Sequence, residues 1–257
     1  MRLTVVGCSG SYPGPDSPAS CYLLEAEHDD GGGARTWRVL LELGNGALGA
    51  LHRVVDPLSI DAVLVSHLHA DHCLDLCGYY VMRKYHPQGP PPRIPVWGPS
   101  DTADRMARAY DLPLDPGMHE EFDFRVLEEP FTVGPFEVQP IPVEHPVDAF
   151  GLRVSADGAT LAYSGDTAPC EGFEQVARDV DLLLAEASFR AQDENPPGIH
   201  LTGRDCGETA ARQGARRLVL THIPPWFDSA DALAEAREVY DGPLDLARAG
   251  AVYELGG

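Results

Sequence analysis

Apolar positions in the first third of the chain occur in short runs that turn-forming residues separate. Leu3 to Val6 is one such run, and it precedes the turn-rich segment GCSGSYPGPDSPAS. Cys21 to Glu27 and Thr36 to Glu42 are strand-like runs on either side of a Gly-rich loop, which predicts a hairpin. Ile60 to Val65 is a short apolar strand, and from about Leu74 to Tyr85 the apolar residues recur at helical spacing.

The rest of the chain predicts further strands and then an alternation of strands and helices. Between Phe122 and His145 the strand-like runs are FDFRVLE, FTVGPFEVQ and IPVEH, and Phe150 to Ser164 holds two more around the turn ADGA. VDLLLAEA and ARRLVLTH are typical of buried strands, and the helix between them begins near Thr202 in a weak capping box and ends at Gly214. A last helix is expected over Ala230 to Tyr240.

This order of elements predicts the fold class. Hairpins come first and strands then alternate with helices, which favours an α/β fold of two mixed sheets that face each other, with helices outside. The 257 residues are enough to bury one large core, and we expect residues 1–257 to form a single domain.

Charge and composition limit the classes of partner that this protein is expected to bind. With 40 acidic and 19 basic side chains the formal charge is −21, so the chain repels a polyanion at long range and an extended nucleic acid is disfavoured. The sequence has no long apolar run and no secretory leader pattern, so we expect a cytoplasmic protein without a membrane partner. The six cysteines are then expected to be free thiols.

The strongest candidate chemistry lies in VSHLHADHCLDL, directly after a predicted strand. His67, His69, Asp71 and His72 place three imidazoles and a carboxylate within six residues, and these are the ligands that borderline and hard divalent metals bind. The alternatives are a solvated polar loop and a helix N-cap formed by Asp71. Four such residues in one tight turn favour a metal site over either alternative.

Three further residues of the same types stand where apolar strands are predicted to end. His145 follows IPVE, Asp166 follows LAYSG, and His222 follows RRLVLT. Any one of them could be an exposed strand end or a turn former. Their shared context predicts that they complete the metal site.

In chain order, HLHADH, a later His, SGDT and THIPP resemble four parts of the five-part motif pattern of the metallo-β-lactamase superfamily. The resemblance implies an αββα four-layer sandwich with two metal ions at the sheet edges. It implies a first metal site of His67, His69 and His145, a second of Asp71, His72 and His222, and Asp166 as the bridging ligand. In the remaining part many members have Asp, where this chain has Glu42, which either orients a ligand or faces elsewhere.

Additional stretches, among them VVGCSGSYPGPDSPAS, RKYHP, GPSDT and FGLR, resemble an atypical bacterial group of cyclic-nucleotide phosphodiesterases in this superfamily. This implies hydrolysis of 3′,5′-cyclic nucleotides, cyclic AMP above all, by a hydroxide held between two metal ions. Asp71 is expected to orient or deprotonate the nucleophile and His200 to assist the leaving oxygen. The other interpretation of His200 is that it caps or packs against the helix that follows it.

Two other activities of the same fold stay open: a ribonuclease Z-like tRNA 3′-processing endonuclease, and a hydrolase of small esters or thioesters. The RNA-processing enzymes of this fold usually carry a long basic arm, and no such insertion is present here. A non-catalytic scaffold would typically have lost ligands, and this chain has all seven.

Cofactor and partner expectations follow from the donor types. Zinc is the first choice for the two divalent ions, and manganese or iron would also fit. We expect a small phosphodiester substrate and a possible homodimer. Trp226 and Phe227 either stack on the nucleobase or pack inside. Cys73 and Cys77 are expected to pack on one helix face.

Overall fold

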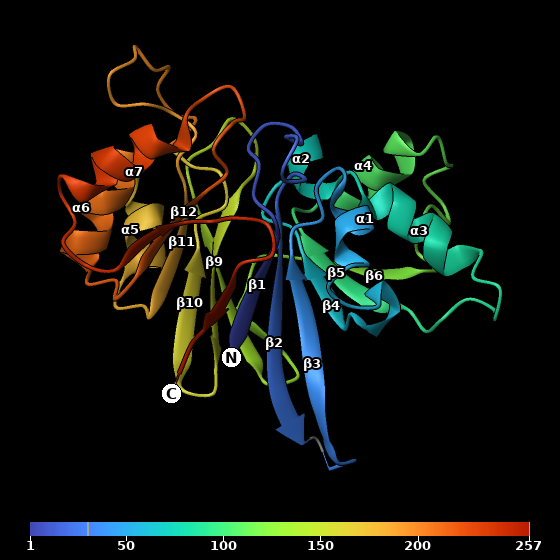
Figure 1. Cartoon of the computed structure of the whole chain (residues 1–257). Coiled ribbons are helices and arrows are strands. Elements are labelled where there is room, and N and C mark those ends of the chain that lie inside the picture. Colours follow the sequence, from blue (N-terminus) through green and yellow to red (C-terminus); the bar gives the residue numbers. More distant parts are fainter. Residues whose placement is uncertain (30, 257) are drawn as a thin grey trace.

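The computed structural model describes residues 1–29 and 31–256 and places two seven-stranded sheets face to face between outer helices (Figure 1). The strands of the first sheet are β1 (Arg2–Gly7), β2 (Cys21–Asp29), β3 (Ala34–Leu41), β4 (Ala62–Leu64), β5 (Ile94–Gly98), β6 (Phe122–Val126) and β14 (Val252–Glu254). Those of the second are β7 (Phe131–Val133), β8 (Phe136–Pro142), β9 (Phe150–Ala156), β10 (Ala159–Tyr163), β11 (Leu182–Glu186), β12 (Leu218–Thr221) and β13 (Leu244–Leu246).

Two sets of helices cover the outer faces of the sheets (Figure 1). Beside the first sheet lie α1 (Ala47–Leu51), the 3-10 helix η1 (Pro57–Ser59), α2 (Ala70–Cys73), α3 (Leu76–Lys84) and α4 (Thr102–Ala109). Beside the second lie α5 (Glu171–Ala177), α6 (Gly203–Gln213) and α7 (Ser229–Arg237). The predicted αββα sandwich is confirmed.

Both sheets mix parallel and antiparallel pairs. The first has the order β14-β1-β2-β3-β4-β5-β6, in which β3 to β6 are parallel and the remaining pairs antiparallel. The second has the order β13-β12-β11-β10-β9-β8-β7, in which β10 to β13 are parallel. Parallel strands of a mixed sheet end at one edge, so the residues that follow them can meet there.

Burial on both faces explains why the central strands are continuous apolar runs. In β11, Leu182 and Leu184 belong to the core between the sheets, whereas Leu183 and Ala185 pack against the outer helices. A strand that is covered on both faces has no solvent side, so its sequence does not alternate with polar residues. The apolar layers therefore hold the strand ends rigidly in place.

Two of the predicted elements were wrong in detail. IPVEH is not a separate strand: β8 ends at Pro142 and His145 lies in the loop beyond it. FTVGPFEVQ is not one strand but the hairpin of β7 and β8, which turns at Gly134 with a φ of 53°. A left-handed φ of this kind favours glycine and permits the tight turn.

The predicted helix near Leu74 divides into two. Asp75 breaks it, because its amide donates to the carbonyl oxygen of Leu43 and its carboxylate accepts from the amide of Leu48. Cys73 therefore ends α2 while Cys77 lies in α3, so the two do not share one helix face as expected, although both pack in the same apolar layer. All six cysteines are free, as expected.

The helix over residues 203–213 confirms its predicted ends. Thr202 accepts from the amide of Asp205 and the Asp205 side chain accepts in return, and Gly214 closes the helix in a left-handed conformation. Among the described residues, no helix is both long enough and apolar enough to cross a bilayer.

Candidate metal centre

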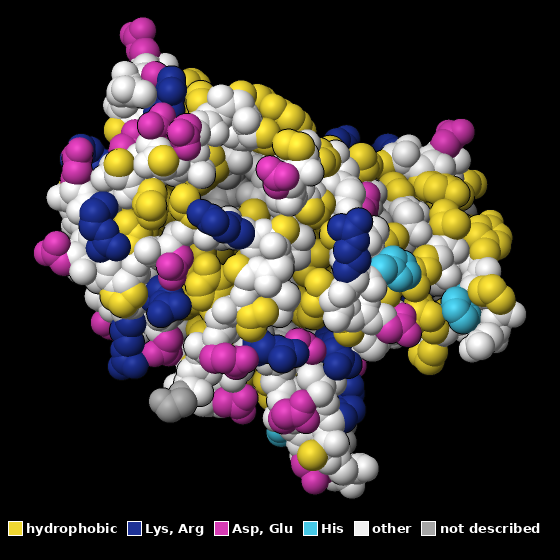
Figure 2. All heavy atoms as spheres, viewed as in Figure 1, with side chains coloured by type: hydrophobic (Ala, Val, Ile, Leu, Met, Phe, Trp, Pro, Cys, Tyr) yellow, Lys and Arg dark blue, Asp and Glu magenta, His cyan; other side chains and the backbone are white. Residues whose placement is uncertain are grey.

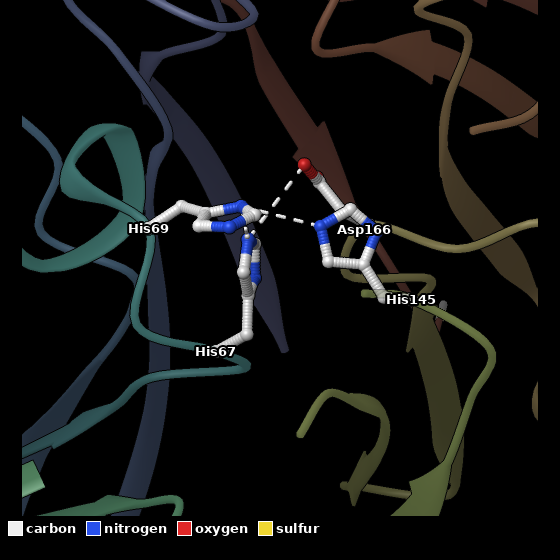
Figure 3. A group of neighbouring side chains, drawn as sticks. All are labelled: His67, His69, His145 and Asp166. Atoms are coloured by element: carbon white, nitrogen blue, oxygen red, sulfur yellow. Dashed lines mark hydrogen bonds and ion pairs between the residues drawn. The ribbon is translucent and has the colours of Figure 1, made fainter. Parts of the chain in front are cut away.

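The structure brings all seven predicted ligand residues to one edge of the sandwich. They form two groups whose ligand-type atoms lie within 4.8 Å of one another in each group, and a third such group joins Asp166 and His222 to His200. The first group contains His67, His69, His145 and Asp166, and the second contains Asp71, His72 and His222. Figure 3 shows the side chains of the first group pointing toward one another from both sheets.

The first group has the spacing of ligands around one small cation. His69 Nδ1 lies 3.1 Å from His67 Nε2 and 3.2 Å from His145 Nε2. Four ligand atoms at tetrahedral positions about 2.1 Å from zinc would be separated by roughly 3.4 Å, which is close to these distances. Three imidazole nitrogens in mutual contact repel one another unless a proton or a cation lies among them.

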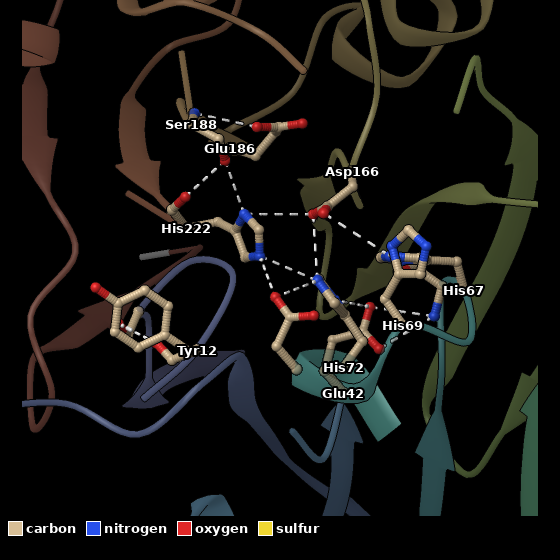
Figure 4. A network of polar contacts seen from close by, with 12 residues as sticks. Tyr12, Glu42, His67, His69, His72, Asp166, Glu186, Ser188 and His222 are labelled. Carbon is tan, nitrogen blue, oxygen red and sulfur yellow. Dashed lines mark hydrogen bonds and ion pairs between the residues drawn. The ribbon is translucent and has the colours of Figure 1, made fainter. Parts of the chain in front are cut away.

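The second group converges in the same way. His72 Nε2 lies 3.1 Å from His222 Nε2, which lies 2.9 Å from Asp71 Oδ2. Asp166 lies between the groups, with Oδ2 at 3.8 Å from His67 Nε2 and Oδ1 at 3.3 Å from His72 Nε2 (Figure 4). Asp166 Oδ1 is buried without a hydrogen-bond partner among the described residues, which fits a carboxylate oxygen that binds a cation.

Outer hydrogen bonds fix the imidazole tautomers. The carbonyl oxygen of Ile199 can only accept, so the contact at 2.9 Å places a proton on His145 Nδ1. The Ser188 hydroxyl donates to the His222 carbonyl oxygen at 2.8 Å, so its oxygen accepts from His222 Nδ1 at 2.9 Å. In both residues Nε2 then directs a lone pair into the site, as a metal requires.

Glu42 faces the site, which answers the question left open by the sequence. Its carboxylate accepts from the amide of Ser66 at 3.1 and 3.2 Å and lies 3.5 Å from His72 Nδ1. Glu42 has no exposed surface, and its φ of 64° is a left-handed conformation that a side chain rarely adopts. The fold holds this carboxylate where it can orient the His72 ring.

Replacement of Glu42 by Gln keeps the shape of the side chain and removes its charge. We expect metal affinity to fall about 10- to 100-fold, since loss of an orienting partner commonly has an effect of this size. Competition with a chromophoric chelator measures the affinity, and Glu120→Gln, an exposed residue paired with Lys84, is the matched control. Equal affinities in the two variants would show that Glu42 does not orient a ligand.

Charge and burial act differently on the individual ligands. Burial and the neighbouring His72 lower the pKa of His67, which keeps this imidazole neutral and able to bind a metal. Burial opposes ionisation of Asp166, but His222 and His72 outweigh it and hold the pKa of this carboxyl well below its usual range. The pKa of His72 is raised despite burial, chiefly by Asp166, so a metal at the second site would displace a proton.

His200 lies beside the two groups and is paired with a buried carboxylate. Its Nδ1 is 2.8 Å from Glu186 Oε1 and 3.9 Å from Asp166 Oδ2. Although burial opposes it, Glu186 raises the pKa of His200 to about 9 by its charge and hydrogen bond. The cap of α6 is Thr202, so His200 does not cap the helix, which was one half of its alternative interpretation; the other half was packing against that helix.

Glu186 was missed by the sequence interpretation, which treated VDLLLAEA only as a buried strand. It is fully buried and also accepts from the amides of Thr167 at 2.9 Å and Ser188 at 3.1 Å. The available signal was an acidic residue at the end of an apolar run, the same context that identified Asp166 and His222. Three hydrogen bonds fix this carboxylate, and it fixes His200 in turn.

An aromatic pair stands at the rim of the site. The rings of Tyr12 and Trp226 are 5.1 Å apart, and Figure 4 places Tyr12 on the side of His222. Trp226 is 58% exposed, so it does not pack inside, whereas Phe227 is half-buried under the Arg190 guanidinium. Exposed indole and phenol rings offer a flat apolar surface to a ligand.

Comparisons with known proteins give the following likenesses. A family model described as a beta-lactamase superfamily domain matches residues 38–223. An uncharacterized protein of Mycobacterium tuberculosis is 46% identical over 95% of this chain and 88% of its own length. A ribonuclease Z of Myxococcus xanthus is 26% identical over 99% of this chain and 98% of its own.

A solved structure agrees with these sequence likenesses. The probable metallo-hydrolase YhfI of Bacillus subtilis is 26% identical over 99% of this chain and 100% of its own length. The crystal structure of YhfI matches the present fold with a TM-score of 0.84 at 25% identity and covers 98% of both chains.

Proposed function

The chain belongs to the beta-lactamase superfamily and is a metallo-hydrolase, and we propose that it is a binuclear phosphodiesterase for 3′,5′-cyclic nucleotides, cyclic AMP above all. One observation carries the proposal. The Asp166 carboxylate lies between the two ligand groups, and His200, whose pKa is raised to about 9, lies beside that same carboxylate. This arrangement suits a reaction in which an anionic diester is attacked and an alkoxide leaves.

The donor set fits two divalent ions. His67, His69 and His145 would hold one, Asp71, His72 and His222 the other, and Asp166 both. Imidazole and carboxylate donors favour zinc, and manganese or iron would also be accepted. Such ions, when bound, polarise the phosphoryl group and neutralise charge on the attacking and leaving oxygens.

The remaining steps belong to this chain's own side chains. Asp71 would orient the attacking water and accept a hydrogen bond from it. His200, held by Glu186 at 2.8 Å, would give its proton to the departing ribose oxygen. Glu186 is a positioning residue, because it acts on the substrate only through the imidazole that it fixes.

A small diester fits this chain better than a folded RNA. The segment from β9 to β10 is a compact hairpin with its turn at Asp157 and Gly158, so it forms no arm. The alignment with the Myxococcus ribonuclease Z extends over 312 positions, more than the 257 residues present here, so that relative has additional segments. The formal charge of −21 adds a long-range repulsion of RNA.

The aromatic pair at the rim supplies a place for the nucleobase. Tyr12 and Trp226 are exposed next to the loop that carries His222, and stacking of a base on such rings contributes about 1–3 kcal/mol. Cytoplasmic localisation and a homodimer stay predictions.

Removal and return of metal test the binuclear proposal. Protein stripped by a chelator should not hydrolyse bis(p-nitrophenyl) phosphate, and activity should return with zinc or manganese and level off at two equivalents. A plateau at one equivalent would refute the binuclear site. Recovery of thioester or lactone hydrolysis without any phosphodiester turnover would instead identify an ester hydrolase.

A further inference from the structure

A cavity lies far from the candidate metal ligands, at the opposite end of the first sheet. Its volume is about 790 Å³, which is within the range of small-molecule sites. It opens beside the starts of β3 and β5 and the approach to β4, whereas the metal ligands follow the ends of these parallel strands. The two sites therefore do not share residues.

The cavity is lined by five arginines, Arg35, Arg38, Arg83, Arg93 and Arg125. A chain with 19 basic side chains against 40 acidic ones thus places about a quarter of its cations around one hollow. Such a concentration creates a local positive potential within an acidic protein. It indicates a site for an anion.

Three of these arginines have carboxylate partners. Arg35 pairs with Asp61 at 2.8 Å, Arg38 with Glu25 at 3.0 Å, and Arg125 with Asp123 at 2.7 Å. Figure 2 shows basic and acidic side chains side by side over the lower part of the β2–β3 hairpin. Ion pairs of this kind fix the guanidinium groups in direction and leave some of their N–H groups free for a ligand.

The other two arginines leave a net positive charge. Within residues 1–29 and 31–256, neither Arg83 nor Arg93 has a carboxylate within 4.0 Å, and Arg93 donates only to the His119 carbonyl oxygen. Arg83 is only 1% exposed, and its terminal nitrogens donate to the Tyr79 hydroxyl and the Pro92 carbonyl oxygen, while its Nε has no hydrogen-bond partner in that part of the chain. A buried guanidinium without a counter-charge is costly, so an anion that enters the cavity would relieve this cost.

Two tryptophans keep the arginines in place. The Arg35 guanidinium lies 3.6 Å from the centre of the Trp37 ring, and that of Arg125 lies 4.8 Å from Trp97. Trp97 in turn stacks on Phe131 at 4.3 Å. Because guanidinium groups already cover these indole faces, the ligand is recognised by its charge and not by stacking of a base.

We propose that this cavity binds a small anion with phosphate groups, separately from the metal centre. Fixed guanidinium groups match the oxygens of phosphate in a bidentate manner, and five of them favour a multivalent anion such as a phosphate ester or pyrophosphate. The acidic remainder of the surface restricts the ligand to a small one, since a long polyanion would be repelled.

The three tryptophans of the chain give a direct test. Trp226→Phe removes the one at the metal centre, so the fluorescence of the metal-loaded variant reports on Trp37 and Trp97. Inorganic phosphate, titrated at constant ionic strength, should produce a saturable change in this tryptophan fluorescence. Adding Arg93→Gln and Arg125→Gln should weaken binding about tenfold or more, because two charged contacts are lost. Arg216→Gln, an exposed arginine paired with Asp181, is the control and should have no effect.

Two results would overturn the proposal. One is a fluorescence change that does not saturate with phosphate. An equal affinity for phosphate in the Arg93→Gln, Arg125→Gln protein and in the control would count in the same way. The other comes from adding Asp166→Ala to the Trp226→Phe protein, which disables the metal centre. Phosphate binding should persist there with unchanged affinity, and its loss would place the phosphate at the metal centre instead.

Discussion

Asp166→Ala is expected to abolish metal binding and phosphodiester hydrolysis together. The two oxygens of Asp166 face the two ligand groups, at 3.8 Å from His67 and 3.3 Å from His72. Without this carboxylate, no negative charge remains between the two ligand groups to hold the two cations. We expect turnover to fall by about 10³-fold or more, since metal-dependent activation of both water and phosphate is removed. Elemental analysis and the initial rate on cyclic AMP measure the two effects.

A matched control separates this effect from general damage. Asp104→Ala removes an exposed aspartate that pairs with Arg108 on α4, and it should leave both metal content and rate unchanged. Circular dichroism should show that both variants are folded. Two retained metal equivalents and a rate within about tenfold of the parent would contradict the bridging role of Asp166.

His200→Ala is expected to lower turnover of cyclic AMP about 10²- to 10³-fold while both metal equivalents are retained. His200 lies outside the two groups assigned to the metal ions, although its ligand atom is close to those of Asp166 and His222. It lies 3.9 Å from Asp166, and Glu186 raises its pKa to about 9, so that it can supply a proton. The loss should be much smaller with bis(p-nitrophenyl) phosphate, because a nitrophenolate leaves without a proton. The measurement is the ratio of kcat in the variant to kcat in the parent protein, determined for cyclic AMP and for bis(p-nitrophenyl) phosphate.

The exposed His52 provides the control for this experiment, and His52→Ala should change neither substrate's kcat. Glu186→Gln should reproduce part of the His200→Ala effect through the same difference between substrates. An equal loss on both substrates, or a loss of metal, would show that His200 supports the site structurally and does not supply a proton.

Residues that follow apolar strands in short motifs could be predicted from sequence. His67, Asp166 and His222 each come directly after a run that is buried on both faces, and such runs are recognisable without a structure. Glu42 lies in the same kind of position, but its direction depends on a left-handed φ that the sequence does not reveal. Local patterns thus predicted which residues meet at the candidate metal centre better than they predicted the backbone around them.

Non-local contacts account for what could not be predicted. The pairs Glu186–His200 and Tyr12–Trp226 join segments 14 and more than 200 residues apart, and no local pattern connects them. β13 and β14 have three residues each, too few for a periodic signal. The arginine-lined cavity likewise gathers residues from several strands and loops, so its charge is invisible in the acidic composition.

Hydrolysis of 3′,5′-cyclic AMP, with a precursor transfer RNA as the parallel substrate, tests the proposed function most directly. The protein would be stripped of metal, reloaded with zinc or manganese, and kcat/KM determined for both substrates. We expect release of AMP that returns only with metal and is absent in Asp166→Ala, with no cleavage of the RNA. Clean cleavage of the RNA 3′ end without turnover of cyclic AMP would contradict the proposal and identify a processing nuclease that lacks the long arm.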